Sequence, residues 1–486
     1  MLSETTTASS TGQGEALVRG LSNRHLQLIA IGGAIGTGLF LGSGKVISLT
    51  GPSVLFIYAV IGCMMFFLMR ALGELLLSNL NYKTFGDIAK DLIGPWAGYV
   101  VSWTYWITWV VICIADIIAI TSYVSYINAS IPPWLPALIT AVVLTILNLQ
   151  PVKFFGEFEF WFAIIKIVAI LALIATGVVL LVIGFENPDT GTQASLAHLW
   201  DDGGMFPFGA SGFLLGFQLG IFSFIGVELV GTAAAETADP HRNLPRAINS
   251  IVVRVLIFYI GALTVIMAIT PWKDLDPADS PFVTTLALAG FGAAAFAINL
   301  VVLTSAASSA NSGFYSGTRM MHALAHDGHA PGGFALTDSR GVPKRAVFFS
   351  AVFLFSAVPI LLLGDSVIEA FTFVTSVAST FILFIWSMIV ISYIQYQRKH
   401  PDRHEASKFK MPLPKVFPWL ILAFFAFILV TLGLAEDTRL PLLFTPIWFV
   451  VIAIMWQFTK RRLTREGRPL TAAIELPGTG EDALHQ

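Results

Sequence analysis

Three ionisable side chains lie within long apolar segments of the sequence. They are Lys166 in FEFWFAIIKIVAILALIATG, Glu228 in GFQLGIFSFIGVELVGTAAAE and Asp116 in VVICIADIIAITSY. If these segments cross a membrane, a charge near the centre costs roughly 2.5–3.5 kcal/mol for Lys or Asp, and such residues commonly serve ion or substrate pathways. All three are therefore candidates for proton chemistry.

Each of the three also has a structural interpretation. Lys166 lies about 13 Å along its segment at 1.5 Å per residue, so it could snorkel to an interface. If it stays buried, desolvation favours its neutral form, and it could carry a proton or donate to helix carbonyls in place of a coupling cation. Glu228 could be a carboxylate bonded to neighbouring backbone. Asp116 could equally be an inter-helix hydrogen-bonding residue.

A glycine-rich apolar segment, LIAIGGAIGTGLFLGSG at 28–44, is the second feature with functional potential. It holds six glycines: Gly32, Gly33, Gly36, Gly38, Gly42 and Gly44. Glycine is a poor helix former, and in lipid an unpaired N–H or C=O costs several kcal/mol, so broken backbone survives only where it lines a cavity. A discontinuous helix that turns free amides and carbonyls toward a midplane cavity is typical of transporter substrate sites.

Composition places these segments in a polytopic membrane protein. Hydrophobic residues make up 56% of the 486 residues and charged residues 12%, and the mean hydropathy is +0.77. Apolar runs of about 20 residues match a hydrocarbon core of ~30 Å. We predict twelve membrane-spanning helices, at 26–49, 53–78, 96–127, 134–150, 157–184, 211–235, 247–270, 284–318, 346–364, 366–396, 415–434 and 440–459. Cys63 and Cys113 lie inside two of them, so neither a disulfide nor a metal site is indicated.

Positive charge lies mostly on one side of the predicted spans. Of the 28 Lys and Arg residues, the opposite loops hold only Lys45, Lys273 and Arg439, and acidic loops at 186–202 and 274–279 lie on that opposite side too. The positive-inside rule predicts that both termini are cytoplasmic, in a multi-pass protein of the cell inner (plasma) membrane. We expect a disordered cytoplasmic tail at 1–18, which lacks the features of a cleavable signal peptide, and a cytoplasmic C-terminal tail at 463–486.

The first and sixth spans are both interrupted by glycine, and this predicts an internal repeat. In the sixth span the interruptions are Gly220, Gly226 and Gly231. The two spans lie five apart, and because five is odd, the second unit must be inverted in the membrane. Helix breaks at equivalent positions form a midplane site. Free amides at half-helix N-termini suit a carboxylate and free carbonyls suit an ammonium group, so the predicted ligand is a zwitterionic amino acid.

Two further patterns have mainly structural interpretations. Arg70 and Glu74 are four residues apart near the end of the second span and are predicted to form an ion pair. The eighth span carries LTSAASSANSGFYSGTR, in which the small residues from Ser305 to Ser316 favour close helix packing. The alternative for this segment is a cavity wall lined by hydroxyl groups.

Several motifs resemble the amino acid–polyamine–organocation superfamily, and within it the bacterial amino acid transporter family. They are LSNRHLQLIAIGGAIGTGLFLGSG, MRALGELLLSNLNYKTFGDIAKDLIGPWAGYVVSWTYW, FGEFEFWFAIIKIVAI and FSFIGVELVGTAAAETADPHRNLPRAINS. The similarity covers roughly residues 17–462. AHLWDDGGMFPFGASGF, TSAASSANSG and HEASKFKMPLPK are similar to a branch of the family that imports D-serine, D-alanine and glycine with protons.

The resemblance implies an all-α fold of the leucine-transporter type, with discontinuous first and sixth helices and a five-plus-five inverted repeat. The permease transmembrane domain would cover 19–462, with repeat one at 26–184, repeat two at 211–396 and two extra helices at 415–459. Amides around Thr37 and Gly38 would hold the substrate carboxylate, within the segment formed by Ile35, Gly36, Thr37 and Gly38. Backbone carbonyls would hold the ammonium group: those of Ala34, Phe222, Ser223 and Ile225.

Three side chains carry further roles in this resemblance. Phe222 occupies the position of an aromatic gate that closes over the bound substrate. Lys166 matches the buried lysine of the fifth span that takes the place of a sodium site in proton-coupled members. Glu228 matches the glutamate of the sixth span, and with Lys166 it is the candidate for proton coupling.

The predicted activity is import of small neutral amino acids by proton symport through alternating access. Alternatives within the class are a permease for L-alanine, proline or an aromatic amino acid, and an exchanger or sensor without net transport is a different class. A membrane-embedded enzyme lacks support, because the nearest histidines are expected in a cytoplasmic loop: His322, His326 and His329. No cofactor and no nucleic-acid partner is indicated, and the expected partners are the substrate, the proton and the bilayer.

Overall fold

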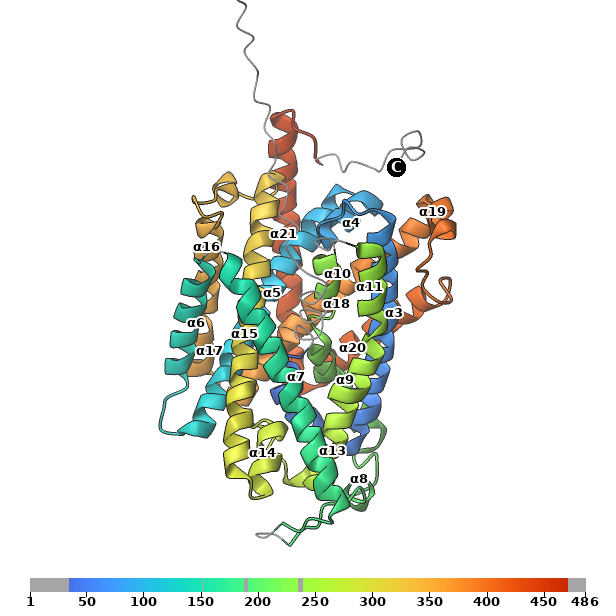
Figure 1. The fold of residues 1–486 in the computed structure, drawn as a ribbon. Helices are drawn as coiled ribbons and strands as arrows, with labels where there is room; N and C mark the ends of the chain where they lie inside the picture. Colours follow the sequence, from blue (N-terminus) through green and yellow to red (C-terminus); the bar gives the residue numbers. More distant parts are fainter. Residues whose placement is uncertain (1–34, 151, 188–190, 235–238, 471–486) are drawn as a thin grey trace, which may run out of the picture.

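The chain folds into a bundle of helices (Figure 1). The computed structural model describes residues 35–150, 152–187, 191–234 and 239–470. Within these ranges the only regular structure besides helices is an isolated β-bridge between Glu186 and Gln193. The predicted tail at 1–18, Ala34 and residues 471–486 lie outside the described residues. The all-helical architecture predicted for the chain is confirmed.

The first half of the chain forms long helices joined by short ones. They are the π-helix η1 (Gly38–Gly42), α2 (Ser43–Thr50), the 3-10 turn η2 (Gly51–Ser53), α3 (Val54–Ser78), α4 (Phe85–Leu92), α5 (Pro95–Ile127), α6 (Trp134–Asn148), α7 (Val152–Val182) and α8 (His198–Asp201). Pro95 opens α5, where its missing N–H costs nothing. Helix α4 begins with a capping box, in which the Thr84 hydroxyl accepts from Asp87 N at 3.1 Å and the Asp87 carboxylate accepts from Thr84 N at 2.9 Å.

The second half is more fragmented. It contains α9 (Gly209–Gly220), the 3-10 turn η3 (Ile221–Phe224), α10 (Leu229–Ala234), α11 (Pro240–Asn249), α12 (Ile251–Arg254), the π-helix η4 (Val255–Gly261), α13 (Ala262–Ile269), η5 (Trp272–Asp274), α14 (Pro281–Leu288), α15 (Gly292–His326), η6 (Gly332–Ala335), α16 (Lys344–Leu354), α17 (Ala357–Leu363), α18 (Val367–Lys399), α19 (Pro401–Ala406), α20 (Phe417–Leu434) and α21 (Glu436–Arg465).

Ten helical stretches in the described part of the chain are long and apolar enough to cross a membrane, so this is a multi-pass membrane protein. One of them, Gly38–Ser78, has 41 residues. At 1.5 Å per residue it would extend about 60 Å, twice a hydrocarbon core of ~30 Å. Gly51, with a φ of +57°, lies within this stretch between α2 and α3. The apolar helix Trp134–Asn148 is shorter than the ten.

The predicted start of the eighth span is wrong. The range 284–318 begins inside α14, whereas the membrane-length helix α15 begins at Gly292 and continues to His326. Gly290, with a φ of +82°, separates the two helices in a conformation that favours glycine. A second expectation also fails here, because His322 and His326 belong to the last turns of α15 and only His329 follows the helix.

The bundle has an inner and an outer set of helices. In α5, 83% of the most apolar stretch is buried by the rest of the protein, and in α18 the share is 78%. The corresponding share is only 17% in α21 and 28% in α7. Helices α5 and α18 therefore form the interior, while α21 and α7 leave apolar surface for lipid.

Charged connections lie at two opposite ends of the bundle. Figure 1 shows α4, α19 and the C-terminal end of α21 at one end, and α8 and α14 at the other. The first end carries basic residues such as Lys90, Arg403 and Arg461, and the second carries acidic residues such as Asp201 and Asp279. The separation of basic and acidic connections inferred from the sequence is therefore present in the fold.

The predicted Arg70–Glu74 ion pair is wrong. The buried Glu74 carboxylate pairs with His404 Nδ1 at 2.6 Å and accepts hydrogen bonds from Tyr393 Oη at 2.7 Å and Met411 N at 3.0 Å. These three donors lie on α18 and on the connection 400–416 that follows it. Glu74 therefore fastens that connection to α3, and three strong donors outcompete one neighbour on its own helix.

Arg70 uses its side chain on the same connection. Its guanidinium carbon lies 3.8 Å from the centre of the Phe409 ring, and it donates to Lys410 O and, at 3.4 Å, to Asn249 Oδ1. A cation over an aromatic face is attracted by the ring quadrupole. Arg70 thus joins α3, α11 and the connection 400–416 at one end of the bundle.

Candidate functional site

The first segment predicted to bind the substrate, residues 35–38, begins where the described chain begins; we call it the first ligand segment. Ile35 and Gly36 are not helical, and the helix starts at Thr37 and continues as the π-helix η1. Gly36 O accepts from both Leu39 N and Phe40 N at 3.2 Å. Ile35, Thr37 and Gly38 are buried, with exposures of 1% for Ile35 and 2% for Thr37, while Gly36 is partly exposed. Ala34, predicted to offer a carbonyl, lies outside the described residues.

The second predicted ligand segment lies where the chain leaves helical geometry after α9. Turn η3 ends at Phe224, Ile225 is extended with φ −64° and ψ 139°, and Gly226 has a φ of +98°. Only then does α10 begin, at Leu229. The positive φ requires a residue without a Cβ, so Gly226 permits this turn.

Glu228 stabilises the turn between η3 and α10. Its Oε2 accepts a hydrogen bond from Gly226 N at 3.0 Å, and the side chain is fully buried. The other oxygen, Oε1, is buried with no hydrogen-bond partner among the described residues. One oxygen therefore has the backbone contact that the structural interpretation of Glu228 foresaw, while the second has the capacity to bind a proton or a donor.

The two ligand segments touch through their backbones. A Cβ placed on Gly38 would lie 2.6 Å from Ser223 Cα and 2.9 Å from Ser223 N. Ser223 is held in turn by two tyrosines: its Oγ lies 3.1 Å from Tyr58 Oη, and its carbonyl accepts from Tyr259 Oη at 2.7 Å. The Ser223 carbonyl is one of the predicted ligands of the substrate ammonium group. Its oxygen has two lone pairs, and Tyr259 uses one of them.

Phe222 closes one side of the contact between η1 and η3. A Cβ on Gly38 would lie 3.0 Å from Phe222 Cδ1, and the ring is 6% exposed. Its edge packs on the Phe371 ring of α18, with 5.8 Å between ring centres. The Phe222 ring of η3 is held against η1 and α18, so it can move only if these three elements move relative to one another.

Lys166 points into the bundle and does not reach an interface. Its side chain is 1% exposed, and its Nζ lies 3.5 Å from Ile35 O on the first ligand segment. Ser305 Oγ of α15 donates to the same carbonyl at 3.4 Å. Lys166 therefore contacts a buried backbone carbonyl just before the helix begins, and the snorkelling alternative is wrong.

Asp116 belongs to the site although the sequence left its role open. Thr37 Oγ1 donates to Asp116 Oδ1 at 2.6 Å, which links η1 to α5. Asp116 Oδ2 is buried without a hydrogen-bond partner among the described residues. On the same side, a Cβ on Gly36 would lie 3.5 Å from Ser309 Oγ. The inter-helix hydrogen bond considered for Asp116 is confirmed.

Sequence reasoning missed Glu159. Its Oε2 accepts hydrogen bonds from Ser308 Oγ and Ser312 Oγ, both at 2.8 Å, and its side chain is 5% exposed. Glu159 precedes Lys166 by seven residues in α7, so both lie on one helix face. That spacing was the available signal. The hydroxyl groups of α15 therefore do more than allow close packing, since they also bind a buried carboxylate and a carbonyl.

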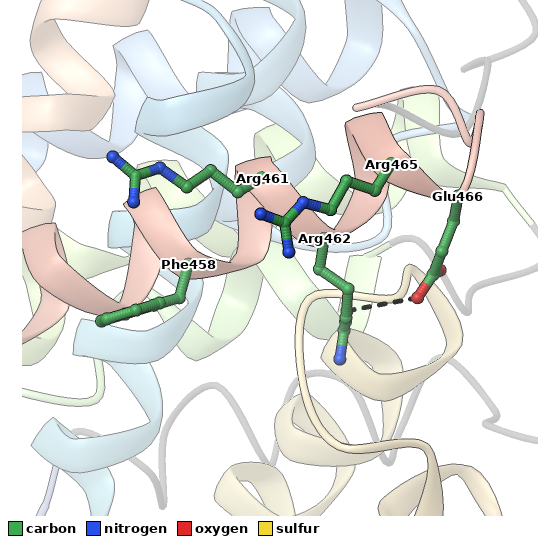
Figure 2. Close-up of a pocket in the computed structure, with 5 residues that line it drawn as sticks. All are labelled: Phe458, Arg461, Arg462, Arg465 and Glu466. Carbon is green, nitrogen blue, oxygen red and sulfur yellow. Dashed lines mark ion pairs between the residues drawn. The ribbon is translucent and has the colours of Figure 1, made fainter.

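A separate surface cavity lies at the C-terminal end of α21. Its volume is about 330 Å³, and its lining consists of Phe458, Arg461, Arg462, Arg465 and Glu466 (Figure 2). Figure 2 shows Arg461 and Arg465 extending along the helix while Arg462 is directed toward Glu466, with which it forms an ion pair at 3.9 Å. None of these residues belongs to the two ligand segments.

Comparison with known proteins yields relatives along nearly the whole chain. The model of the family described as "Amino acid permease" matches residues 25–467. The D-serine/D-alanine/glycine transporter of Escherichia coli is 54% identical over 454 residues, which cover 93% of this chain and 96% of the relative. An amino-acid permease of Bacillus subtilis is 49% identical over 451 residues, covering 93% and 97%. The DL-alanine permease of Lactococcus lactis is 40% identical over 445 residues, covering 91% and 95%.

Proposed function

This chain belongs to the amino acid permease family, and from that premise we propose that it imports D-serine, D-alanine and glycine together with protons. Permeases of this family move amino acids across membranes. The specific substrates come from the name of the Escherichia coli relative, which is 54% identical. The protein is thus a transporter, and its action requires no covalent step.

The observation that carries this proposal is the backbone contact between η1 and η3. Gly38 in η1 lies against Ser223 in η3 inside the bundle. The chain leaves helical geometry close to both residues, at Gly36 before η1 and at Ile225 after η3. Amides of Thr37 and Gly38 would bind the substrate carboxylate, in the segment that includes Ile35 and Gly36. Carbonyls would bind the ammonium group: those of Ala34, Phe222, Ser223 and Ile225. Peptide ligands at both ends suit any small zwitterion.

The proposed architecture has twelve spans, with discontinuous first and sixth helices and a five-plus-five inverted repeat. The 41-residue stretch Gly38–Ser78 would supply two spans, and the shorter helix α6 another. Repeat one would cover 26–184 and repeat two 211–396, within a transmembrane domain at 19–462. Both termini would be cytoplasmic in the cell inner membrane, because basic connections gather at the end that carries α4 and α19.

In the proposed transport cycle, substrate and proton enter from outside and Phe222 closes over the substrate. The two repeats then rock, and both cargoes leave inside. Lys166 would couple the proton to this motion, because its contact with Ile35 O ties α7 to the substrate segment. Glu228 would be the second proton-linked group. Peptide groups read chirality poorly unless the side-chain pocket is tight, so a shallow, small pocket would accept glycine and both small D-amino acids.

Uptake by purified protein in proteoliposomes tests the proposal. Labelled D-alanine should accumulate above its outside concentration when the outside is acidic, the lumen starts empty and no other gradient exists. A protonophore should abolish the accumulation. Uptake only when the lumen is preloaded with amino acid would instead indicate an exchanger.

Competition against labelled glycine separates the possible substrates. Unlabelled D-serine and D-alanine should compete, whereas proline and aromatic amino acids should not. Strong competition by proline or by an aromatic amino acid, with none by D-alanine, would contradict the substrate assignment. The same vesicles without protein give the background.

A further inference from the structure

We propose that Glu159 receives the coupling proton from Lys166 on the cytoplasmic side of the site. This rests on the proton symport proposed above and names the group through which the proton leaves. Neither residue needs to touch the substrate. Glu159 acts after the substrate segment has moved, as a positioned proton acceptor.

The placement of Glu159 along α7 supports the direction of transfer. Figure 1 shows α7 beginning at the end of the bundle that carries α4 and running toward the end that carries α8. With 1.5 Å per residue, Glu159 lies about 10 Å from the start of α7 at Val152, and Lys166 lies about 10 Å deeper. Glu159 therefore lies between Lys166 and the proposed cytoplasmic surface.

Glu159 and Lys166 lie on the same face of α7. They are seven residues apart, which is two helical turns and one face. Side chains in a helix lean toward its N-terminus, so the long Lys166 side chain leans toward Glu159. The carboxylates whose charges act on the Lys166 ammonium are Glu159 and Asp116. Lys166 thus lies between an acid on the substrate side and an acid on the cytoplasmic side.

The hydroxyls of α15 prepare Glu159 to accept and then release a proton. Ser308 and Ser312 donate to the same carboxylate oxygen, Oε2, at 2.8 Å each. Two donors stabilise the ionised carboxylate in a buried place where an unpaired charge would be costly. They also hold the carboxylate in one place, so that it can take a proton without the movement of a helix.

The transfer balances as an acid–base step. The Lys166 ammonium gives one proton to a Glu159 oxygen, which leaves a neutral amine and a carboxylic acid. The acid then gives the proton to water at the cytoplasmic side and becomes a carboxylate again. Asp116 keeps its hydrogen bond with Thr37 at the substrate end. Because the acceptor is Glu159, a low internal pH blocks release by keeping that carboxyl protonated.

The variant Glu159→Gln tests this step in proteoliposomes. It keeps the size of the side chain and removes the proton acceptor. We expect net accumulation driven by a pH gradient to fall at least about tenfold, while counterflow of labelled glycine, which needs no net proton movement, stays within about twofold of wild type. We also expect the variant to lose the inhibition by low internal pH that wild type shows.

Thr318→Val is the matched control. It removes a buried hydroxyl of α15 that donates to Tyr315 O on its own helix at 2.9 Å and leaves both donors of Glu159 in place, so accumulation should persist. If Glu159→Gln accumulates glycine as well as wild type does, the proposal is wrong. It is equally wrong if counterflow and accumulation fall together, because that result indicates a purely structural role. Failure of wild type to accumulate at all would instead overturn the proton symport, and so the two failures are distinguishable.

A second variant decides the case if Glu159→Gln does not reach the membrane. In the double variant Ser308→Ala/Ser312→Ala the carboxylate loses both donors, so it holds a proton more strongly. The internal pH that halves uptake should therefore move upward relative to wild type. An unchanged midpoint would overturn the assignment of Glu159.

Discussion

Gly38 and Ser223 lie so close that a Cβ on Gly38 would be 2.6 Å from Ser223 Cα. No side chain fits between these two backbones, and both residues lie inside the protein. The contact joins η1 to η3 and positions the peptide groups on which the proposed substrate site depends. A residue with a Cβ at position 38 must push the two segments apart.

Gly38→Ala should therefore abolish transport while leaving the protein in the membrane. The matched control is Gly42→Ala in the same π-helix, because a Cβ there would meet its nearest atom, Phe371 Cε1, at an ordinary 3.7 Å. We expect uptake to fall at least about tenfold in the first variant and to stay near wild type in the second. Uptake assays normalised to membrane protein measure both. Equal uptake by the two variants would show that the contact is dispensable.

Thr37→Val should weaken substrate binding and stability. The change removes the donor to Asp116 and leaves a buried carboxylate oxygen unpaired, at a cost of about 1–3 kcal/mol. We expect a lower midpoint of thermal unfolding in detergent and a higher KM for uptake. The control is Thr121→Val on α5, whose hydroxyl only donates to Ile118 O on its own helix. Equal losses of stability and uptake in Thr37→Val and Thr121→Val would mean that the effect comes from helix stability alone.

Lys166→Met should uncouple transport from the proton gradient. Methionine retains a long flexible side chain of similar reach and removes the charge. We expect accumulation under a pH gradient to disappear, while exchange of labelled for unlabelled glycine continues. Lys90→Met is the control, since Lys90 is also buried but pairs with Asp327 at 3.7 Å outside the site. Unchanged accumulation in Lys166→Met would remove Lys166 from coupling.

Because His329 is buried, we predict that the folded protein loses stability on acidification. Burial holds the pKa of His329 below its usual value, and the positive charges of Lys90 and Arg462 lower it further. The hydrogen bond with the Leu470 carbonyl and the charge of Asp327 raise the pKa but do not offset the burial. The folded protein therefore binds fewer protons at this site than the unfolded chain does. The stability that His329 provides is complete above about pH 6.5 and is lost as the pH falls below that value.

Thermal unfolding in detergent from pH 8 to pH 5 measures this effect. The wild type should lose more stability on acidification than His329→Gln, which keeps a donor for Leu470 O but does not titrate. His329 Nε2 lies 3.2 Å from that carbonyl. Identical pH profiles for the two proteins would mean that this histidine does not contribute.

Glu74→Ala should release the connection 400–416 from α3. The change leaves three donors without their acceptor: His404, Tyr393 and Met411 N. Leaving a buried hydrogen-bond donor without its acceptor costs about 1–3 kcal/mol. We expect faster tryptic cleavage within the connection, which carries Lys408 and Lys410. The control Glu405→Ala removes an exposed carboxylate nearby, and cleavage at the wild-type rate in Glu74→Ala would contradict the prediction.

The sequence predicted the helices well because membrane spans are determined locally. A run of about 20 apolar residues identifies a span without knowledge of its neighbours. Positive φ values at Gly226 and Gly290 mark places where a helix ends. The sequence placed the break at Gly226 and not the one at Gly290, because Gly290 and Gly292 lie in a continuous apolar stretch that is long enough to be one span.

The contacts of the site could not be predicted in the same way. Thr37 and Asp116 are 79 residues apart in sequence, and Ser308 and Glu159 are 149 apart. Which buried acid meets which donor depends on how the helices rotate against one another, and no local pattern determines that rotation. Glu74 shows the same limit, because it pairs with His404, 330 residues away, and not with Arg70, four residues before it.

The main-chain contact at η1 and η3 has an evolutionary consequence. Peptide groups are the same in every residue, so in the proposed site substitution would not readily change how the two ends of a nutrient are bound. What substitution would change is the space for the middle of the nutrient, around Phe222. A duplicated gene could therefore acquire a new specificity through one or two exchanges there, and inherit the machinery that uses the ion gradient intact.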